Sequence, residues 1–308
     1  MKSKGHKYRR YVIGLGIGVV LIVAAVIVRS LFREDYVIKA QQKKLIAKKE
    51  EASKQEASEV LTPGPVIQEV MEEGEQEVAE EKQWTEMSPT EAPIPTSTPI
   101  PDPVMLPEYA VLYKENPDII GWLSIDGTNI DYPVMQTPED EQYYLYRDFY
   151  GKDNKNGSLI MDTDSTVGVG TVGAEYAGGT KPSTNLLIHG HNMKSGLMFG
   201  KLSLYEDEAY GNEHRIICFD SLYEKREYEL IAVFRSRVYN KNDEVFKFYQ
   251  FFQADTEDEF QTWYRNIKGM ALYDTGVTAQ LGDEFITLTC CAYHVEDGRL
   301  VVVGKRIK

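Results

Sequence analysis

Residues 285–307 read FITLTCCAYHVEDGRLVVVGKRI. β-favouring residues lie on both sides of the turn-forming sequence Glu-Asp-Gly at 296–298, which predicts a strand, a hairpin turn and a second strand. Because successive strand side chains point to opposite faces, Cys290 and Cys291 cannot both face one groove. If Cys291 faces the groove, Cys290 points into the core.

The hairpin combines a thiol with a guanidinium, because Arg299 follows Cys291 by eight residues. Together they can attack a carbonyl carbon and hold the negative charge that results. A free cysteine is mostly protonated near neutral pH, so the thiol needs a base or a cation nearby. The best candidate is in TNLLIHGHNM, residues 184–193, where an apolar strand runs into His189-Gly190-His191. Glycine suits a strand end where the backbone bends or a ligand comes close.

Short β-like runs recur through the C-terminal two thirds of the chain, with turns between them. This frequency predicts an antiparallel barrel or a sandwich. The longest helical pattern covers residues 256–268, with Asp255-Thr256 as its cap and an apolar face.

Two motifs taken together resemble the sortases, and class B within that family. The matching residues are Thr287-Leu288-x-x-Cys291-x-Tyr293, Arg299, and Gly190-His191-Asn192-Met193. The sequence NPDIIGW at 116–122 and the helical pattern at 257–273 also fit class B. The resemblance covers residues 109–308, about two thirds of the chain.

One position departs from the family pattern, which usually has threonine immediately before its cysteine. This chain has Cys290 there. The eight-residue step to Arg299 and the offset of Tyr293 assign the family's cysteine position to Cys291.

The resemblance implies a mainly β fold: a closed antiparallel sortase-type barrel of about eight strands with peripheral helices. It also implies a cysteine transpeptidase without cofactor or metal. Cys291 would attack the carbonyl of a threonine–glycine bond in a sorting peptide and form a thioacyl-enzyme. His191 would exchange protons with the leaving and incoming amines, and Arg299 would donate hydrogen bonds to the substrate carbonyl or the oxyanion.

The implied partners are surface proteins that carry a sorting signal, and a peptidoglycan precursor or pilin that supplies the acceptor amine. Four further residues are expected to bind the substrate. Thr289 and Tyr293 share the face of Cys291, Asn185 lies on the strand that leads to His191, and Tyr249 lies in an aromatic run before the last helix.

Three alternatives remain open from the residues. A thiol protease would share the acylation step and use water as the acceptor. His189-x-His191 with a nearby cysteine is also a zinc-like constellation, although the opposite facing of the two adjacent cysteines disfavours it. A non-catalytic surface module would work without the Cys291 thiol.

Composition excludes two other classes. The chain has 308 residues and a formal net charge of -14, which argues against nucleic acid because phosphate binding needs a basic face. It contains three cysteines, two of them adjacent, so no disulfide framework is expected. Cys218 has the pattern of a buried strand residue.

The N-terminus has the pattern of a membrane anchor. Residues 1–10 are basic and free of acids, and residues 11–28 are uncharged and mostly apolar. As a helix they would span ~27 Å, close to the hydrocarbon thickness of a bilayer. We expect an uncleaved signal-anchor at 11–29 that contacts membrane lipid, with residues 1–10 in the cytoplasm.

The remaining residues form two predicted regions. Residues 30–106 are first rich in Lys and Glu, then acidic, then proline-rich, which predicts an extracellular stalk. We expect its helical part to be solvated and to lie outside the core. Residues 107–308 are the predicted catalytic domain, placed outside the cell membrane of a single-membrane bacterium.

Overall fold

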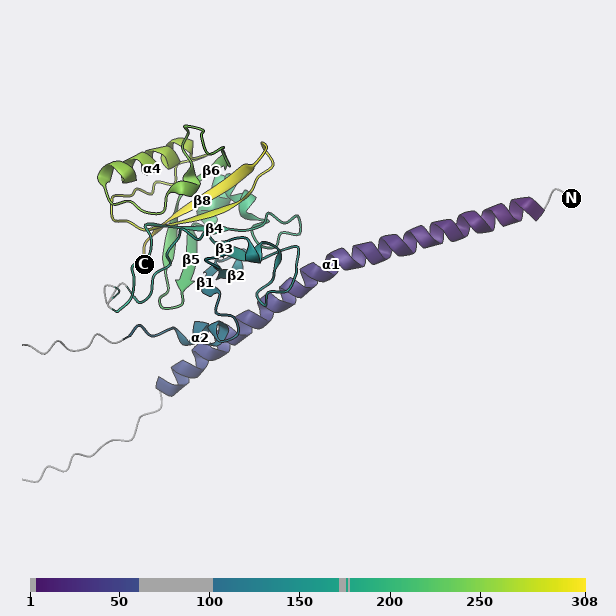
Figure 1. Ribbon diagram of the computed structural model, residues 1–308, viewed down its shortest axis with the longest axis horizontal. Helices are drawn as coiled ribbons and strands as arrows, with labels where there is room; N and C mark the ends of the chain where they lie inside the picture. The colour runs from purple at the N-terminus through teal and green to yellow at the C-terminus, as the bar shows by residue number, and fades with distance from the viewer. Residues whose placement is uncertain (1–3, 61–101, 172–175, 177) are drawn as a thin grey trace, which may run out of the picture.

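The computed structural model describes residues 4–60, 102–171, 176 and 178–308 (Figure 1), with only the backbone described for residues 4–19 and a few others of the first helix. The strands are β1 (Ile119–Ser124), β2 (Asp131–Met135), β3 (Leu159–Met161), β4 (Asn185–His189), β5 (Ile216–Ser221), β6 (Glu227–Arg237), β7 (Phe285–Cys291) and β8 (Gly298–Arg306). The helices are α1 (Lys4–Val60), α2 (Pro107–Tyr113), α3 (Glu208–Glu213) and α4 (Glu257–Met270), and the 3-10 turns include η1 (Tyr143–Tyr146), η3 (Leu202–Glu206) and η4 (Phe248–Gln250).

The eight strands form a closed barrel in the order β1-β2-β3-β4-β7-β8-β6-β5, with β5 paired to β1. Six neighbouring pairs are antiparallel, but β2–β3 and β4–β7 are parallel. The prediction of an antiparallel barrel was therefore wrong in this respect. The long connection from β4 to β7 includes β5, β6 and α4, which lets the chain return to the same end of the barrel before β7 begins.

Alternating side chains divide the strands between two apolar clusters. On β7, Ile286, Leu288 and Cys290 join the barrel interior, whereas Phe285 joins a second cluster on the outer face. α4 covers that outer face beside β6 and β8 (Figure 1). Its predicted cap is confirmed, because Thr256 and Glu259 form a capping box.

The C-terminal half of α1 packs against the barrel and α2 (Figure 1). Ile38, Leu45 and Ala52 recur every seven residues on one side of the helix and are 4%, 1% and 8% exposed. The expectation that the helical part of the 30–106 stalk lies outside the core was therefore wrong. The sparse apolar positions of this segment lie on one face, and the barrel provides the surface that buries them.

Polar contacts also join α1 to the barrel. The side-chain amide of Gln42 donates a hydrogen bond to the Asp131 carbonyl at 2.9 Å. The Lys49 ammonium lies 4.5 Å from the centroid of the buried Trp122 ring, within cation–π range. Burial lowers the pKa of Lys49 below its ordinary value.

The predicted anchor at 11–29 lies within α1, where most side chains are outside the described part. Among the residues that the structure describes, no helix combines the length and the apolar character needed to cross a membrane. Residues 1–3 and the acidic and proline-rich part of the predicted stalk at 61–101 lie outside the described residues.

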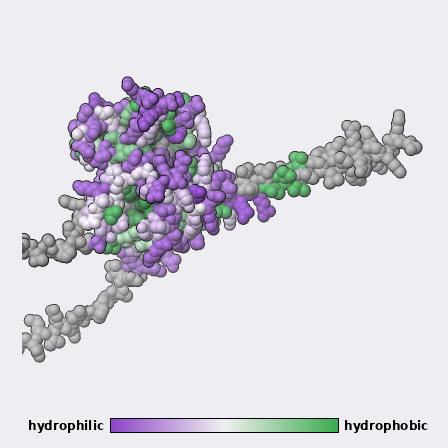
Figure 2. All heavy atoms as spheres, in the orientation of Figure 1, coloured by the Kyte–Doolittle hydropathy of each residue, from purple (hydrophilic) through white to green (hydrophobic). Residues whose placement is uncertain are grey.

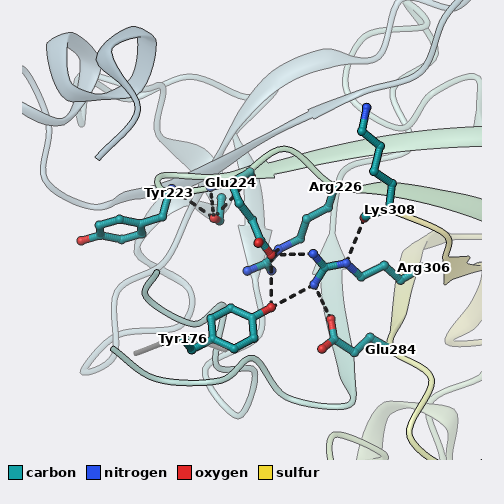
Figure 3. A network of polar contacts seen from close by, with 8 residues as sticks. Tyr176, Tyr223, Glu224, Arg226, Glu284, Arg306 and Lys308 are labelled. Carbon is teal, nitrogen blue, oxygen red and sulfur yellow. Dashed lines mark hydrogen bonds and ion pairs between the residues drawn. The ribbon is translucent and has the colours of Figure 1, made fainter. Parts of the chain in front are cut away.

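A buried network of charges joins the β5–β6 turn to β8 (Figure 3). Arg226 is fully buried, and its Nε donates to Glu224 at 2.7 Å. Arg306 donates to the same Glu224 oxygen and to Glu284, each at 2.6 Å. The Tyr176 hydroxyl donates to Glu224 at 3.1 Å. The guanidinium groups of Arg226 and Arg306 therefore share the buried carboxylate of Glu224.

Candidate active site

The three predicted catalytic residues lie around one cleft, because of how β4, β7 and β8 pair. β4 runs parallel to β7 with His189 opposite Thr289, so His191 and Cys291 follow at the same end of the barrel. β8 runs antiparallel to β7 with Arg299 opposite Cys291. The cleft has a volume of about 570 Å³. Its lining includes Glu141, Gln142, Leu145, Tyr146, His189, His191, Val238, Thr289, Cys290, Cys291 and Arg299.

The turn from β4 into His191 requires Gly190. A Cβ at this position would lie 2.5 Å from the Phe199 ring and 2.7 Å from a Leu159 methyl group. The close neighbours are therefore core side chains, which hold the chain against the barrel where it leaves β4.

His191 is held by the segment η1. Its Nε2 lies 2.7 Å from the Leu145 carbonyl oxygen, and its ring centroid lies 5.3 Å from that of Tyr146. The neighbouring Asn192 donates a side-chain hydrogen bond to the Cys291 carbonyl at 2.8 Å. This bond ties the loop after β4 directly to the end of β7.

The two adjacent cysteines have different environments. Cys290 is 3% exposed and packs in the barrel interior, and its burial raises the pKa of the thiol to about 12. Cys291 is partly exposed at the cleft. A thiol that stays protonated is a poor nucleophile, so the environment favours Cys291 as the reactive residue.

Arg299 follows a tight turn that aims it at the cleft. Asp297 has a φ of 54°, in the left-handed region, and a Cβ at Gly298 would lie 2.2 Å from the Ala292 carbonyl oxygen. Nη1 of Arg299 donates to the carbonyls of Asp297 and Gly298 at 3.2 and 3.0 Å. These bonds orient a partly buried guanidinium beside Cys291.

Comparison with known proteins identifies the family of this chain. No model of a known protein family matches the chain. Sortase B of Listeria monocytogenes is 30% identical over 202 residues, which cover 64% of this chain and 72% of that protein. The chain belongs to the sortase B family. Sortase B of Staphylococcus aureus is 26% identical over 207 residues, covering 66% of this chain and 75% of that protein.

Solved sortase B structures have the same fold. The sortase B of Bacillus anthracis in complex with AAEK1 superposes with a TM-score of 0.55 at 29% identity, covering 69% of this chain and 90% of that one. The Staphylococcus aureus sortase B–substrate complex gives 0.56 at 26% identity, covering 66% and 86%. Sortases B are cysteine transpeptidases, so the chain is an enzyme of that class.

The four substrate-binding residues predicted for this sortase B are not gathered at one place. Thr289 lines the cleft, and its hydroxyl donates to the Leu300 carbonyl. Tyr293 is 81% exposed on the loop after β7 and does not line the described cleft.

Neither Asn185 nor Tyr249 lines the described cleft. Asn185 is fully buried at the far end of β4, where its amide donates to the Phe251 carbonyl and its oxygen accepts from Thr287. The backbone N–H of Tyr239 donates to the Tyr249 hydroxyl at 3.0 Å. The position of Asn185 on the strand that leads to His191 did not place it in the cleft, because Asn185 begins β4 and His191 follows the other end of that strand.

No sequence pattern pointed to Leu145 and Tyr146, which contact His191. The Leu145 contact is made by a backbone carbonyl, which has no signature in the side-chain pattern. Tyr146 lies in a run of tyrosines, Tyr143, Tyr144 and Tyr146, whose different roles depend on the turn that they form.

The zinc-like grouping of His189 with His191 is not assembled in the described residues. His189 instead lies 3.1 Å from an Asp162 carboxylate oxygen. Across the described part of the chain, the group of His, Cys or acidic residues close enough to hold a metal is Glu141, Asp162 and His189, with ligand atoms within 4.8 Å of one another. Burial raises the pKa of Glu141, and the neighbouring Asp162 raises it further. This group includes neither His191 nor Cys291.

Proposed function

We propose that this sortase B cleaves the C-terminal sorting signal of secreted proteins at a threonine–glycine type bond and transfers them to a cell-wall or pilin amine. The observation that carries the proposal is the shared cleft of His191, Cys291 and Arg299. Relatives support it through their ligands, since solved sortases B include a substrate complex and a complex with triglycine.

In the first step the Cys291 sulfur attacks the threonine carbonyl carbon. A C–S bond forms and the carbonyl electrons move to oxygen, where Arg299 donates hydrogen bonds. The tetrahedral intermediate then collapses, the C–N bond breaks, and protonated His191 gives its proton to the leaving amine. The products are a thioacyl-enzyme and the released C-terminal peptide.

In the second step an acceptor amine attacks the thioester carbon. A C–N bond forms, the C–S bond breaks, and His191 takes the proton that the amine loses. The Cys291 thiolate is regenerated. Water in place of the amine would give hydrolysis, so the identity of the acceptor decides between transpeptidase and thiol protease.

The proposed location is the outer side of a cell membrane, with a single span at residues 11–29. The uncharged run at 11–28 supports this location. Hydrophobic side chains gather on the arm that extends from the folded part of the molecule (Figure 2), and the exposed apolar residues of α1 include Val20, Leu21 and Ile22. In this arrangement residues 1–10 are cytoplasmic, and residues 30–106 and the catalytic domain at 107–308 lie on the outer side.

The experiment incubates the protein with a panel of pentapeptides that end in Thr-Gly, with and without triglycine, and identifies the products by mass spectrometry. We expect a ligated Thr-Gly-Gly-Gly product. Cys291→Ala and His191→Ala should abolish it, and Arg299→Ala should lower kcat by about 100-fold, the effect of losing one oxyanion donor. Cys290→Ala is the matched control and should retain activity.

Each alternative has its own outcome. Hydrolysed peptide alone, even at high triglycine, would make the protein a thiol protease. Loss of turnover on chelation would point to a metal enzyme. Unchanged activity in Cys291→Ala would remove the proposed mechanism.

A further inference from the structure

The segment η1 presents two groups to His191, one to an edge nitrogen and one to the ring. The Leu145 carbonyl lies 2.7 Å from Nε2, and the Tyr146 ring lies 5.3 Å away with an interplanar angle of 33°. Tyr146 is 60% exposed, so the barrel core does not account for its position. Tyr146 therefore has a large exposed ring that contacts His191 at the cleft, which suggests a role in the site.

The Leu145 contact assigns the protons of the imidazole. A carbonyl oxygen can only accept a hydrogen bond, so Nε2 must carry a proton in both the neutral and the charged ring. The nitrogen that gains and loses the catalytic proton is then Nδ1. A ring rotation that broke the Leu145 bond would exchange the two nitrogens and remove this assignment.

The Tyr146 ring opposes such a rotation. Its centroid lies 5.3 Å from that of the imidazole at an interplanar angle of 33°, so a rotated imidazole would have to move past the tyrosine ring. The Leu145 carbonyl and the Tyr146 ring together hold the imidazole in one orientation.

The segment η1 is itself held by the motif Asn116-Pro117-Asp118, which the catalytic chemistry leaves unexplained. The Tyr144 hydroxyl donates to Asp118 at 2.7 Å and accepts from the Asn116 amide at 2.6 Å. Tyr144 is 2% exposed, so this anchor is in the core. Immediately after η1, Arg147 donates to the Tyr143 carbonyl at 2.7 Å.

We propose that Tyr146 is a positioning residue, held by the Asn116–Asp118–Tyr144 network, which together with the Leu145 carbonyl fixes His191 so that Nδ1 exchanges the catalytic proton. The inference deepens the proposed function and rests on His191 being its acid and base. Tyr146 acts through His191 and takes no part in bond making.

The kinetic test compares Tyr146→Ala, Tyr146→Phe and Tyr144→Phe in the full chain, with the pentapeptide that turns over fastest. We expect Tyr146→Ala to lower kcat about 10-fold with KM nearly unchanged, since misplacing a catalytic group mainly slows chemistry. Tyr146→Phe should restore most of kcat, because the ring remains. Tyr144→Phe should lower kcat by a smaller factor. Tyr36→Ala, a 74% exposed tyrosine on α1, is the control for general effects.

The spectroscopic test does not depend on turnover. The ¹⁵N shifts of the His191 ring, assigned with His191→Gln, should show the Nε2–H tautomer in the wild-type protein and a mixture of tautomers in Tyr146→Ala. A rise in KM with unchanged kcat would make Tyr146 a substrate contact and overturn the proposal. Unchanged ring shifts in Tyr146→Ala would overturn it as well. Activity retained by His191→Ala would instead contradict the proposed function. The His191 ring shifts of the wild-type protein and of Tyr146→Ala would still test the contact between the two rings.

Discussion

Replacing Ile38 by alanine tests whether α1 is part of the folded catalytic unit. Ile38 is 4% exposed and packs with side chains of the barrel interior. Truncating a buried isoleucine to alanine typically costs about 3 kcal/mol, from lost transfer free energy and from the cavity. For a domain of this size that lowers Tm by roughly 6–12 °C. Urea and thermal unfolding of the chain from residue 30 measure both quantities.

The adjacent Val37 provides a matched control. It is also β-branched and lies on the same helix, but it is 41% exposed. Alanine has the higher helix propensity at both positions, so Val37→Ala should change the free energy of unfolding by less than about 0.5 kcal/mol. Equal effects of the two substitutions would show that α1 does not depend on its apolar contacts with the barrel. The fluorescence of Trp122, beneath Lys49, reports separately whether α1 stays docked.

Three further predictions concern buried charge and the cleft. Burial raises the pKa of Cys290 to about 12 from 9.0, so the unfolded chain releases this proton first. The contribution of this thiol to the free energy of unfolding is complete below about pH 9 and falls by up to 1.4 kcal/mol per pH unit toward pH 12. Urea titrations at increasing pH should show this fall in the wild-type protein and a flatter slope in Cys290→Ala. Glu224→Gln should lower the free energy of unfolding by about 3 kcal/mol, because it leaves buried Arg226 without its carboxylate. Glu229→Gln, at a partly exposed ion pair, should lower it by less than about 1 kcal/mol in the same assay. Arg299→Lys should keep the charge but lose the planar fork, lowering kcat by about 10-fold or more in the peptide assay, and wild-type rates would contradict the proposed oxyanion role.

Local patterns predicted the strands and α4 well, because each carries its own periodicity. The hairpin of β7 and β8 follows from β-favouring runs around Glu296-Asp297-Gly298, and the cap at Thr256 follows from a Glu three residues later. Strand alternation predicted that Cys290 and Cys291 face opposite sides, and the family resemblance assigned the groove to Cys291. In the structure Cys290 packs in the interior.

The docking of α1 was not predicted, although its signal is present. The apolar residues at 38, 45 and 52 recur every seven residues, but charged residues on the same helix give the segment the appearance of a solvated one. Which surface buries them depends on the barrel, with Trp122 and Asp131 more than seventy residues away. Contacts at this sequence distance leave no mark in a local pattern.

The candidate site depends on the direction of β4 relative to β7. No local sequence pattern encodes that direction. In the parallel pair His189 lies opposite Thr289, so His191 and Cys291 leave their strands at the same end. Had β4 run antiparallel over the same five residues, His189 would lie near Phe285, about 13 Å along the strand at 3.3 Å per residue. Proton transfer needs hydrogen-bond distance, so that arrangement would separate the base from the thiol. The motifs around His191 and Cys291 would point to the same residues in either topology. Only the parallel pairing of strands separated by nearly a hundred residues joins them into one site.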